Sequence, residues 1–174
     1  MNPLSTFVIP IYGIKPGEHW FDFICDETFF SHFEDSPIER GLIQVKLRVF
    51  KTIDFFQLEF WVEGAVEAVC DRCTADINLP TKGNWSIVLK YAEEEREEDE
   101  VYYILTSQHH FDTSKIIYDG IVISMPIIKV YDCEEDTPRP CNMKVLEILE
   151  KHQQNISPPD DENTVWDSIK KIDF

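Results

Sequence analysis

Cysteines are the residues of this chain whose types and spacing most readily support chemistry. Two of the five form a CxxC pair, Cys70 and Cys73, and two more, Cys133 and Cys141, are separated by seven residues. Zinc favours four cysteine or histidine ligands in a tetrahedron, and one CxxC turn supplies two of them. The sequence therefore predicts a candidate zinc site at Cys70, Cys73, Cys133 and Cys141.

The CxxC pair has two further interpretations. A redox-active CxxC usually lies at a helix N-terminus, which lowers the thiol pKa, whereas this pair follows a strand pattern and precedes an expected strand at 77–79. The pair could also be packed thiols at a turn, as we expect for Cys25 at the end of an aromatic strand. The five histidines form no recognisable motif. Zinc site, redox pair and structural turn all stay open at this point.

A long strand must position the first thiol. From residue 56 to 70 every even position is apolar, glycine or cysteine, which is typical of a half-buried strand and directs Cys70 inward. A second alternating segment, 42–50, precedes it. A turn at Thr52-Ile53 would pair the two as a hairpin, with Val49 opposite Phe56. The same register would pair two lysines with acids, Lys46 with Glu59 and Lys51 with Asp54.

The remaining patterns predict an α+β fold: an antiparallel twisted sheet or partial β-barrel with two or three short helices. We expect further strands at 5–12, 19–24, 85–91 and 101–106 and helices at 26–33, from 112 to before Pro126, and at 143–152. Eight consecutive charged residues from 93 to 100 indicate a mobile acidic loop at 92–100. We therefore predict one domain over 1–152, followed by a linker and a C-terminal tail at 153–174 that contains Trp166.

Charge limits the classes of partner. The chain has 16 basic and 33 acidic residues, a formal net charge of −17. This charge opposes nonspecific binding to nucleic acid or anionic lipid and favours basic protein partners. No stretch reaches the roughly 18 apolar residues of a membrane span, and residues 1–10 do not resemble a signal peptide. We expect a cytoplasmic protein with reduced thiols.

The first half of the sequence contains one basic cluster, and the chain carries no catalytic motif. Lys46 and Arg48, flanked by Arg40 and Lys51, could contact RNA phosphate, but pairing with acids across the hairpin is the simpler interpretation. The sequence contains no glycine-rich phosphate loop, no nucleophile elbow and no HExxH helix. We therefore expect neither an enzyme nor a small-molecule substrate.

Four sets of residues occur in a characteristic order: 64–73, 119–126, Cys133 with Cys141, and 163–172. This order makes the chain similar to the YceD family, the large ribosomal RNA subunit accumulation proteins. The stretch 64–73, which ends in Cys-Asp-Arg-Cys, resembles the family's strand and CDRC-type motif. The stretch 119–126 resembles its short helix that ends in an apolar-then-proline step, and Cys133 and Cys141 fall at its second cysteine cluster. The helix after Cys141 is similar to the shorter, Bacteroidetes-type form. The stretch 163–172 resembles the terminal DPRW element, although Asn163-Thr164-Val165 replaces its Asp-Pro-Arg.

The resemblance implies a cytoplasmic bacterial factor that supports accumulation of large-subunit ribosomal RNA and ribosome assembly, with no established catalysis. Together with the charge, it favours a large-subunit ribosomal protein or a precursor particle as partner and leaves direct RNA contact open. We expect partner contacts at Arg72, Trp166, Lys170 and Lys171. The alternative is a zinc-stapled cytoplasmic adaptor unrelated to ribosomes that uses the Trp166 tail as its ligand.

Overall fold

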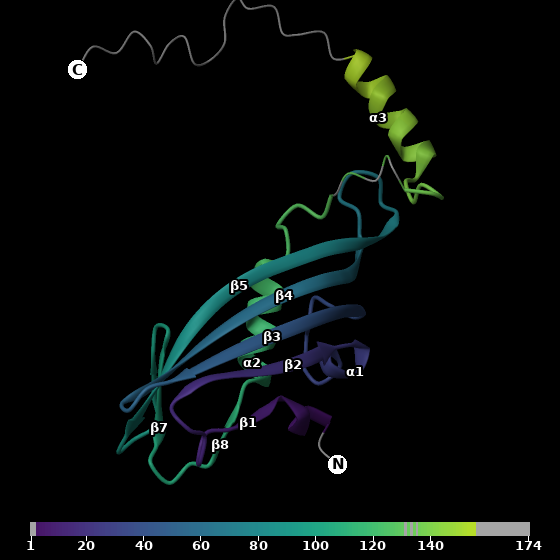
Figure 1. The fold of residues 1–174 in the computed structure, drawn as a ribbon. Coiled ribbons are helices and arrows are strands. Elements are labelled where there is room, and N and C mark those ends of the chain that lie inside the picture. The colour runs from purple at the N-terminus through teal and green to yellow at the C-terminus, as the bar shows by residue number, and fades with distance from the viewer. Residues whose placement is uncertain (1–2, 131, 133, 135, 156–174) are drawn as a thin grey trace, which may run out of the picture.

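A six-stranded, mostly antiparallel sheet dominates the structure, a computed structural model that describes residues 3–130, 132, 134 and 136–155 (Figure 1). Its strands are β2 (Gly17–Cys25), β3 (Gly41–Lys51), β4 (Phe55–Val69), β5 (Asp76–Ala92), β6 (Arg96–Glu98) and β7 (Val101–Leu105). Their order is β2-β3-β4-β5-β7-β6, and only β5 and β7 run parallel. A two-stranded sheet pairs β1 (Val8–Pro10) with β8 (His110–Asp112).

Three α-helices and one 3-10 helix accompany the sheets in the described part of the chain. They are η1 (Pro3–Phe7), α1 (Glu27–Phe30), α2 (Ser114–Ser124) and α3 (Met143–Asn155). Asp26 caps α1 as its position predicts, because its side chain accepts a 3.1 Å hydrogen bond from the Phe29 N–H. The predicted α+β class with a twisted antiparallel sheet is confirmed, and the sheet remains open rather than closing into a barrel. No helix among the described residues has the length and apolar character needed to span a lipid bilayer.

Several predicted segments differ from the structure. The strands predicted at 77–79 and 85–91 are parts of the single strand β5, and the helix predicted at 26–33 is limited to Glu27–Phe30. Residues 5–12 do not form one strand, since η1 occupies the first part and β1 is only three residues long. The acidic stretch 92–100, predicted as a loop, contains β6, which pairs with β7 and places Arg96 opposite Tyr103. The guanidinium of Arg96 lies 4.1 Å from the centre of the Tyr103 ring. This contact and the β6–β7 ladder give part of the acidic stretch a regular backbone.

The β3–β4 hairpin forms, but its register differs from the predicted one by two residues. Val49 lies opposite Leu58 rather than Phe56. The turn falls one residue later, at 53–54, because Thr52 closes it: its N–H donates to the Phe55 carbonyl over 2.9 Å, and its Oγ1 accepts from the Phe55 N–H over 3.1 Å. An even shift keeps every side chain on its predicted face.

The shift changes the charge pairs of this hairpin. The predicted Lys46–Glu59 and Lys51–Asp54 pairs are wrong: Arg48 lies opposite Glu59 and forms the ion pair with it. Lys51 instead donates a 2.8 Å hydrogen bond to a backbone carbonyl, that of Ile14. Cross-strand pairing nevertheless accounts for Arg48, the central cation of the basic cluster.

The core lies on one face of the large sheet, where α2 packs against β5. The approach is close, because a Cβ atom on Gly120 would come within 2.1 Å of the Trp85 ring, and one on Gly83 within 1.9 Å of the Ser124 hydroxyl. Trp85 in turn stacks on Phe60 with ring centroids 5.2 Å apart. Gly120, which weakens α2 as an isolated helix, is the residue that lets α2 reach the sheet.

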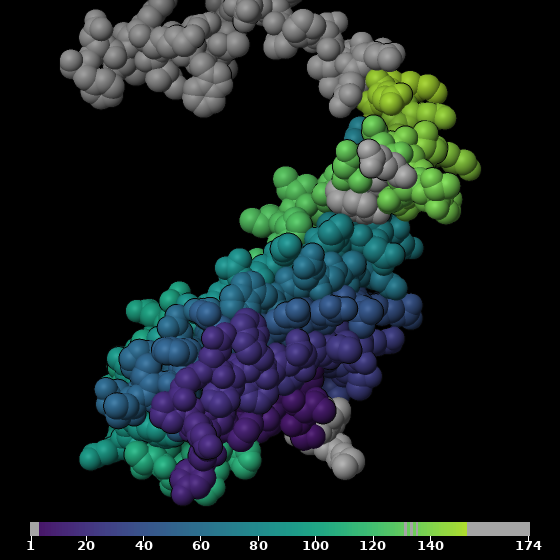
Figure 2. All heavy atoms as spheres, in the orientation of Figure 1, coloured from purple at the N-terminus to yellow at the C-terminus, as the bar shows by residue number. Residues whose placement is uncertain are grey.

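The opposite face of β2 to β5 has no helix or strand over it among the described residues, and its side chains form the face seen in Figure 2. Trp20 on β2 and Trp61 on β4 lie there, with exposed fractions of 55% and 38%. The sheet therefore has one covered face and one open face.

The close approach of α2 gives a stability prediction. Gly120→Ala should lower the free energy of unfolding by about 1–3 kcal/mol, because the added methyl group overlaps the rigid Trp85 ring. Ile123→Ala, on the exposed side of the same helix, should change it by less than about 0.5 kcal/mol. Denaturant unfolding monitored by circular dichroism would measure both. Equal or greater stability of Gly120→Ala would show that helix propensity outweighs the contact.

Candidate cysteine site

The CxxC motif forms the turn that joins β4 to β5. The Cys70 N–H donates to the Ala75 carbonyl over 2.8 Å, and the Thr74 N–H donates to the Cys70 carbonyl over 2.9 Å. Thr74 completes the reversal with a φ of 56°, in the left-handed region. Strands on both sides hold this turn, as the sequence predicts, and both sulfur atoms face inward, with exposed fractions of 7% for Cys70 and 2% for Cys73.

Cys73 is the centre of the site. The backbone N–H of Asn142 lowers the pKa of the Cys73 thiol, and hydrogen bonds from the Ala75 backbone and from the thiols of Cys70 and Cys141 lower it further, against the opposing effect of burial. Hydrogen bonds to a sulfur favour its thiolate, which is the form that binds metals and attacks disulfides. Cys70 from the same turn and Cys141 from a later segment thus lie within hydrogen-bonding distance of the Cys73 sulfur.

Two hydrogen bonds between Asp71 and Lys129, which we call the latch, hold the later cysteine segment against the turn. The Lys129 N–H donates to Asp71 Oδ2 over 2.6 Å, and the Asp71 N–H donates back to the Lys129 carbonyl over 3.1 Å. These two bonds fix the chain after α2 against the CxxC turn, so that Cys141 and the first turn of α3 can return to Cys73. The aspartate within the CxxC motif therefore has a positioning role that the spacing of the cysteines does not indicate.

A cavity of about 430 Å³ opens beside the sulfur atoms. Cys70, Cys73 and Cys141 line it, together with Arg72, Val130, Asp132, Glu134, Arg139 and Leu146. The space is large enough for an ion or for a partner's side chain, and its wall carries charges of both signs.

The predicted site residues have different outcomes. Cys70, Cys73 and Cys141 come together, and Arg72 lines the cavity beside them. Cys133, Trp166, Lys170 and Lys171 lie outside the described residues. Within 3–130, 132, 134 and 136–155, no three histidine, cysteine, aspartate or glutamate side chains have the arrangement that a metal ion requires. The described cysteines form no disulfide. The zinc site and the redox pair both stay predictions.

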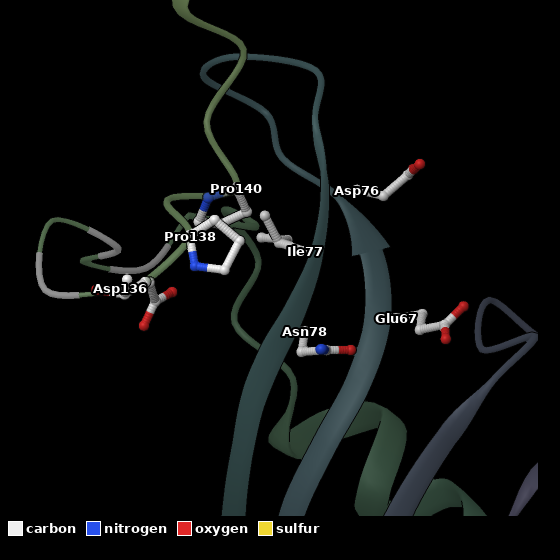
Figure 3. A pocket seen from close by; sticks show the side chains of 8 residues that line it. Glu67, Asp76, Ile77, Asn78, Asp136, Pro138 and Pro140 are labelled. Carbon is white, nitrogen blue, oxygen red and sulfur yellow. The ribbon is translucent and has the colours of Figure 1, made fainter.

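Sequence reasoning missed an acidic cavity of about 480 Å³ beside the same hairpin (Figure 3). Figure 3 shows Pro138 and Pro140 next to Ile77, while Glu67 and Asp136 lie on opposite sides of the hairpin. The carboxylates do not converge on one point, so the cavity does not form a metal centre. Glu67 near the end of β4 and Asp76 at the start of β5 were its signal in the sequence.

The family comparison matches most of this structure. The model of the family described as large ribosomal RNA subunit accumulation protein YceD matches residues 58–172. The chain belongs to the YceD family. The YceD match begins within β4 and includes the CxxC turn, α2, the Asp71–Lys129 latch and Cys141. Searches of curated proteins and of solved structures gave no match.

The start of the YceD match divides the sheet in two. The strands β2 and β3 precede residue 58, whereas β5 and the cysteine site lie within the match. The family region therefore includes the cysteine turn and its supporting segments, and the first strands of the open face lie before it.

Cys25 and Cys73 should affect the pH dependence of stability in opposite directions. Burial, with a smaller effect of Asp26, raises the pKa of the Cys25 thiol, so the folded chain keeps a proton that the unfolded chain loses above about pH 8.5. The stability due to Cys25 is therefore full below that pH and falls above it by up to about 1.4 kcal/mol per pH unit. The lowered pKa of Cys73 contributes stability above the unfolded pKa, which is lost as the pH falls through the folded pKa.

The measurement is the free energy of unfolding between pH 7 and 10, with reductant and chelator present. Cys25→Ala should reduce the loss of stability at high pH, and Cys73→Ala should increase it. Parallel curves for the two variants would contradict these opposite pKa shifts.

Proposed function

We propose that this protein supports accumulation of large-subunit ribosomal RNA by binding a protein of the large subunit or a precursor particle, without catalysing a reaction. The observation that supports this proposal best is the YceD match over 58–172, which spans most of the chain. The matched region includes the cysteine turn and the segments that the latch holds against it. We place the binding surface beside this turn, with Arg72 as a contact residue.

Charge favours a basic protein over bare RNA as the direct partner. The formal net charge of −17 repels a phosphate backbone, whose binding depends on lysine and arginine. Proteins that bind ribosomal RNA carry those cations, and an acidic chain attracts them over long distances. The acidic cavity that contains Glu67, Asp76 and Asp136 would be complementary to such a partner. The C-terminal residues Trp166, Lys170 and Lys171 would provide a second contact.

We further propose that Cys70, Cys73, Cys133 and Cys141 bind one zinc ion. Donors to Cys73 from the backbone at Asn142 and Ala75 stabilise the thiolate that zinc needs. The ion would join the CxxC turn to the segment before α3 and so fix a structural node next to the binding surface. Arg72 would be held at the edge of this node.

Loss of the gene should lower the amount of large-subunit ribosomal RNA relative to small-subunit RNA in its host, and the wild-type gene should restore the ratio. Tagged protein should sediment with large-subunit precursor particles at low salt and dissociate at high salt, because charge drives the docking. Quantitative RNA measurement and gradient sedimentation check both results. An unchanged RNA ratio, together with retention of only non-ribosomal partners, would instead support the adaptor alternative.

Zinc can be tested on the purified full chain. Protein prepared without chelator should contain about one zinc ion per chain by elemental analysis. Cys73→Ser and Cys133→Ser should each reduce this content strongly, whereas Cys25→Ser, which changes a core thiol remote from the CxxC turn in sequence, should retain it. A zinc content near zero in the wild-type protein would refute the site.

A further inference from the structure

Exposed large side chains gather on the open face of β2 to β5. We call this set, together with the partly exposed Arg48, the open-face patch: Trp20, Ile24, Leu42, Arg48, Phe50 and Trp61. Trp20, Phe50 and Trp61 lie near Arg48, whereas Ile24 and Leu42 lie further along the same face, beyond the outward pair of Asp22 and Lys46. Single exposed apolar residues are ordinary, but several large ones on one face are typical of a surface that another molecule covers. Tryptophan and arginine are also the residues most enriched among energetically dominant interface contacts.

The sheet register fixes the patch before any partner binds. Trp20 lies opposite Arg48, and Trp61 occupies the next outward position on β4 after Glu59. The two indole rings stack with centroids 5.8 Å apart, and the Arg48 guanidinium lies 5.9 Å from the Trp61 ring centre. Side chains that already hold each other on rigid strands lose little conformational entropy when they are covered.

The charge of Arg48 distinguishes a protein partner from RNA. Its guanidinium pairs with Glu59 and lies 4.0 Å from Glu18, so it is neutralised within the sheet. A phosphate would have to compete with these carboxylates, whereas an apolar protein surface would cover a pair that is already formed. The patch therefore favours protein contacts over a nucleic-acid backbone.

An acidic hollow adjoins the aliphatic end of the patch. Leu42 lines this cavity of about 550 Å³ together with the carboxylates of Asp26, Glu27 and Glu67. Arg40 is the cation in this lining, and its ion pairs are long, at 3.9 Å to Glu27 and 3.8 Å to Glu67. Excess negative charge beside exposed aliphatic groups is complementary to an apolar contact flanked by lysine or arginine.

We propose that the open-face patch docks a basic protein, whose apolar side chains cover Trp20 and Trp61 and whose lysine or arginine enters the acidic hollow. This inference rests on the proposed function, because it assigns the large-subunit protein partner to a particular face. It adds a surface, formed largely by β2 and β3, that lies mostly before the family match. Its acidic hollow shares Glu67 with the acidic cavity beside the cysteine turn.

Site-specific cross-linking tests the occupant in cells that produce the full chain. Photoreactive p-benzoylphenylalanine would replace Ile24 in the patch or, as a matched control, Ile123 on α2, both of which are exposed isoleucines. We expect the Ile24 position alone to cross-link to a basic large-subunit protein, identified by mass spectrometry. Cross-links to RNA, to a second copy or to residues 156–174 of the same chain, or no product beyond the control, would overturn the proposal.

The purified partner then gives the affinity, and complementation separates the two proposals. The double substitution Trp20→Ala with Trp61→Ala should weaken binding about tenfold or more, while Ile123→Ala and the double Trp→Phe variant should stay close to wild type. Circular dichroism would confirm that each variant folds. If the wild-type gene restores the RNA ratio and the double alanine variant does so equally well, the docking face is wrong and the proposed function stands. If the wild-type gene has no effect on the ratio, the proposed function itself fails.

Discussion

The antiparallel pairing of β4 with β5 is the constraint on which the other elements depend. It runs without a break from Phe55 opposite Lys90 to Val69 opposite Asp76, and it is the longest ladder in the sheet. Because side chains alternate along paired strands, this ladder fixes the covered face and the open face over its whole length. Its far end is the CxxC turn, so the cysteine geometry follows directly from the strand pairing.

Much of this arrangement can be predicted from alternation alone. The even positions of β4 identify the strand, its inward face and the inward direction of Cys70, and both strands of the β3–β4 hairpin follow from the same rule. The exact register does not, because it depends on one threonine whose hydroxyl closes the turn at Phe55. Local hydrogen bonds of this kind leave no periodic signal in the sequence.

Tertiary contacts explain what could not be predicted. The hydrogen bonds between Asp71 and Lys129 hold the later segment where Cys141 can reach Cys73. Neither Asp71 nor Lys129 is one of the candidate metal ligands. The parallel pairing of β5 with β7 likewise depends on how the chain returns after β6. The open-face patch does have a signal in the sequence: Trp20 and Trp61 fall on the outward phase of their strands, where a half-buried sheet usually carries polar residues.

An exposed aromatic face creates a risk of self-association, and charge offers a physical way to limit it. Two copies of a chain with a net charge of −17 repel each other, and this repulsion acts before the apolar faces can meet. The exposed strand β6, at one edge of the sheet, consists only of charged residues, which discourages pairing with another edge. The same negative charge attracts a basic protein. In the proposed docking, repulsion between copies and attraction to a cationic partner would together select one occupant for a face whose contacts alone give little specificity.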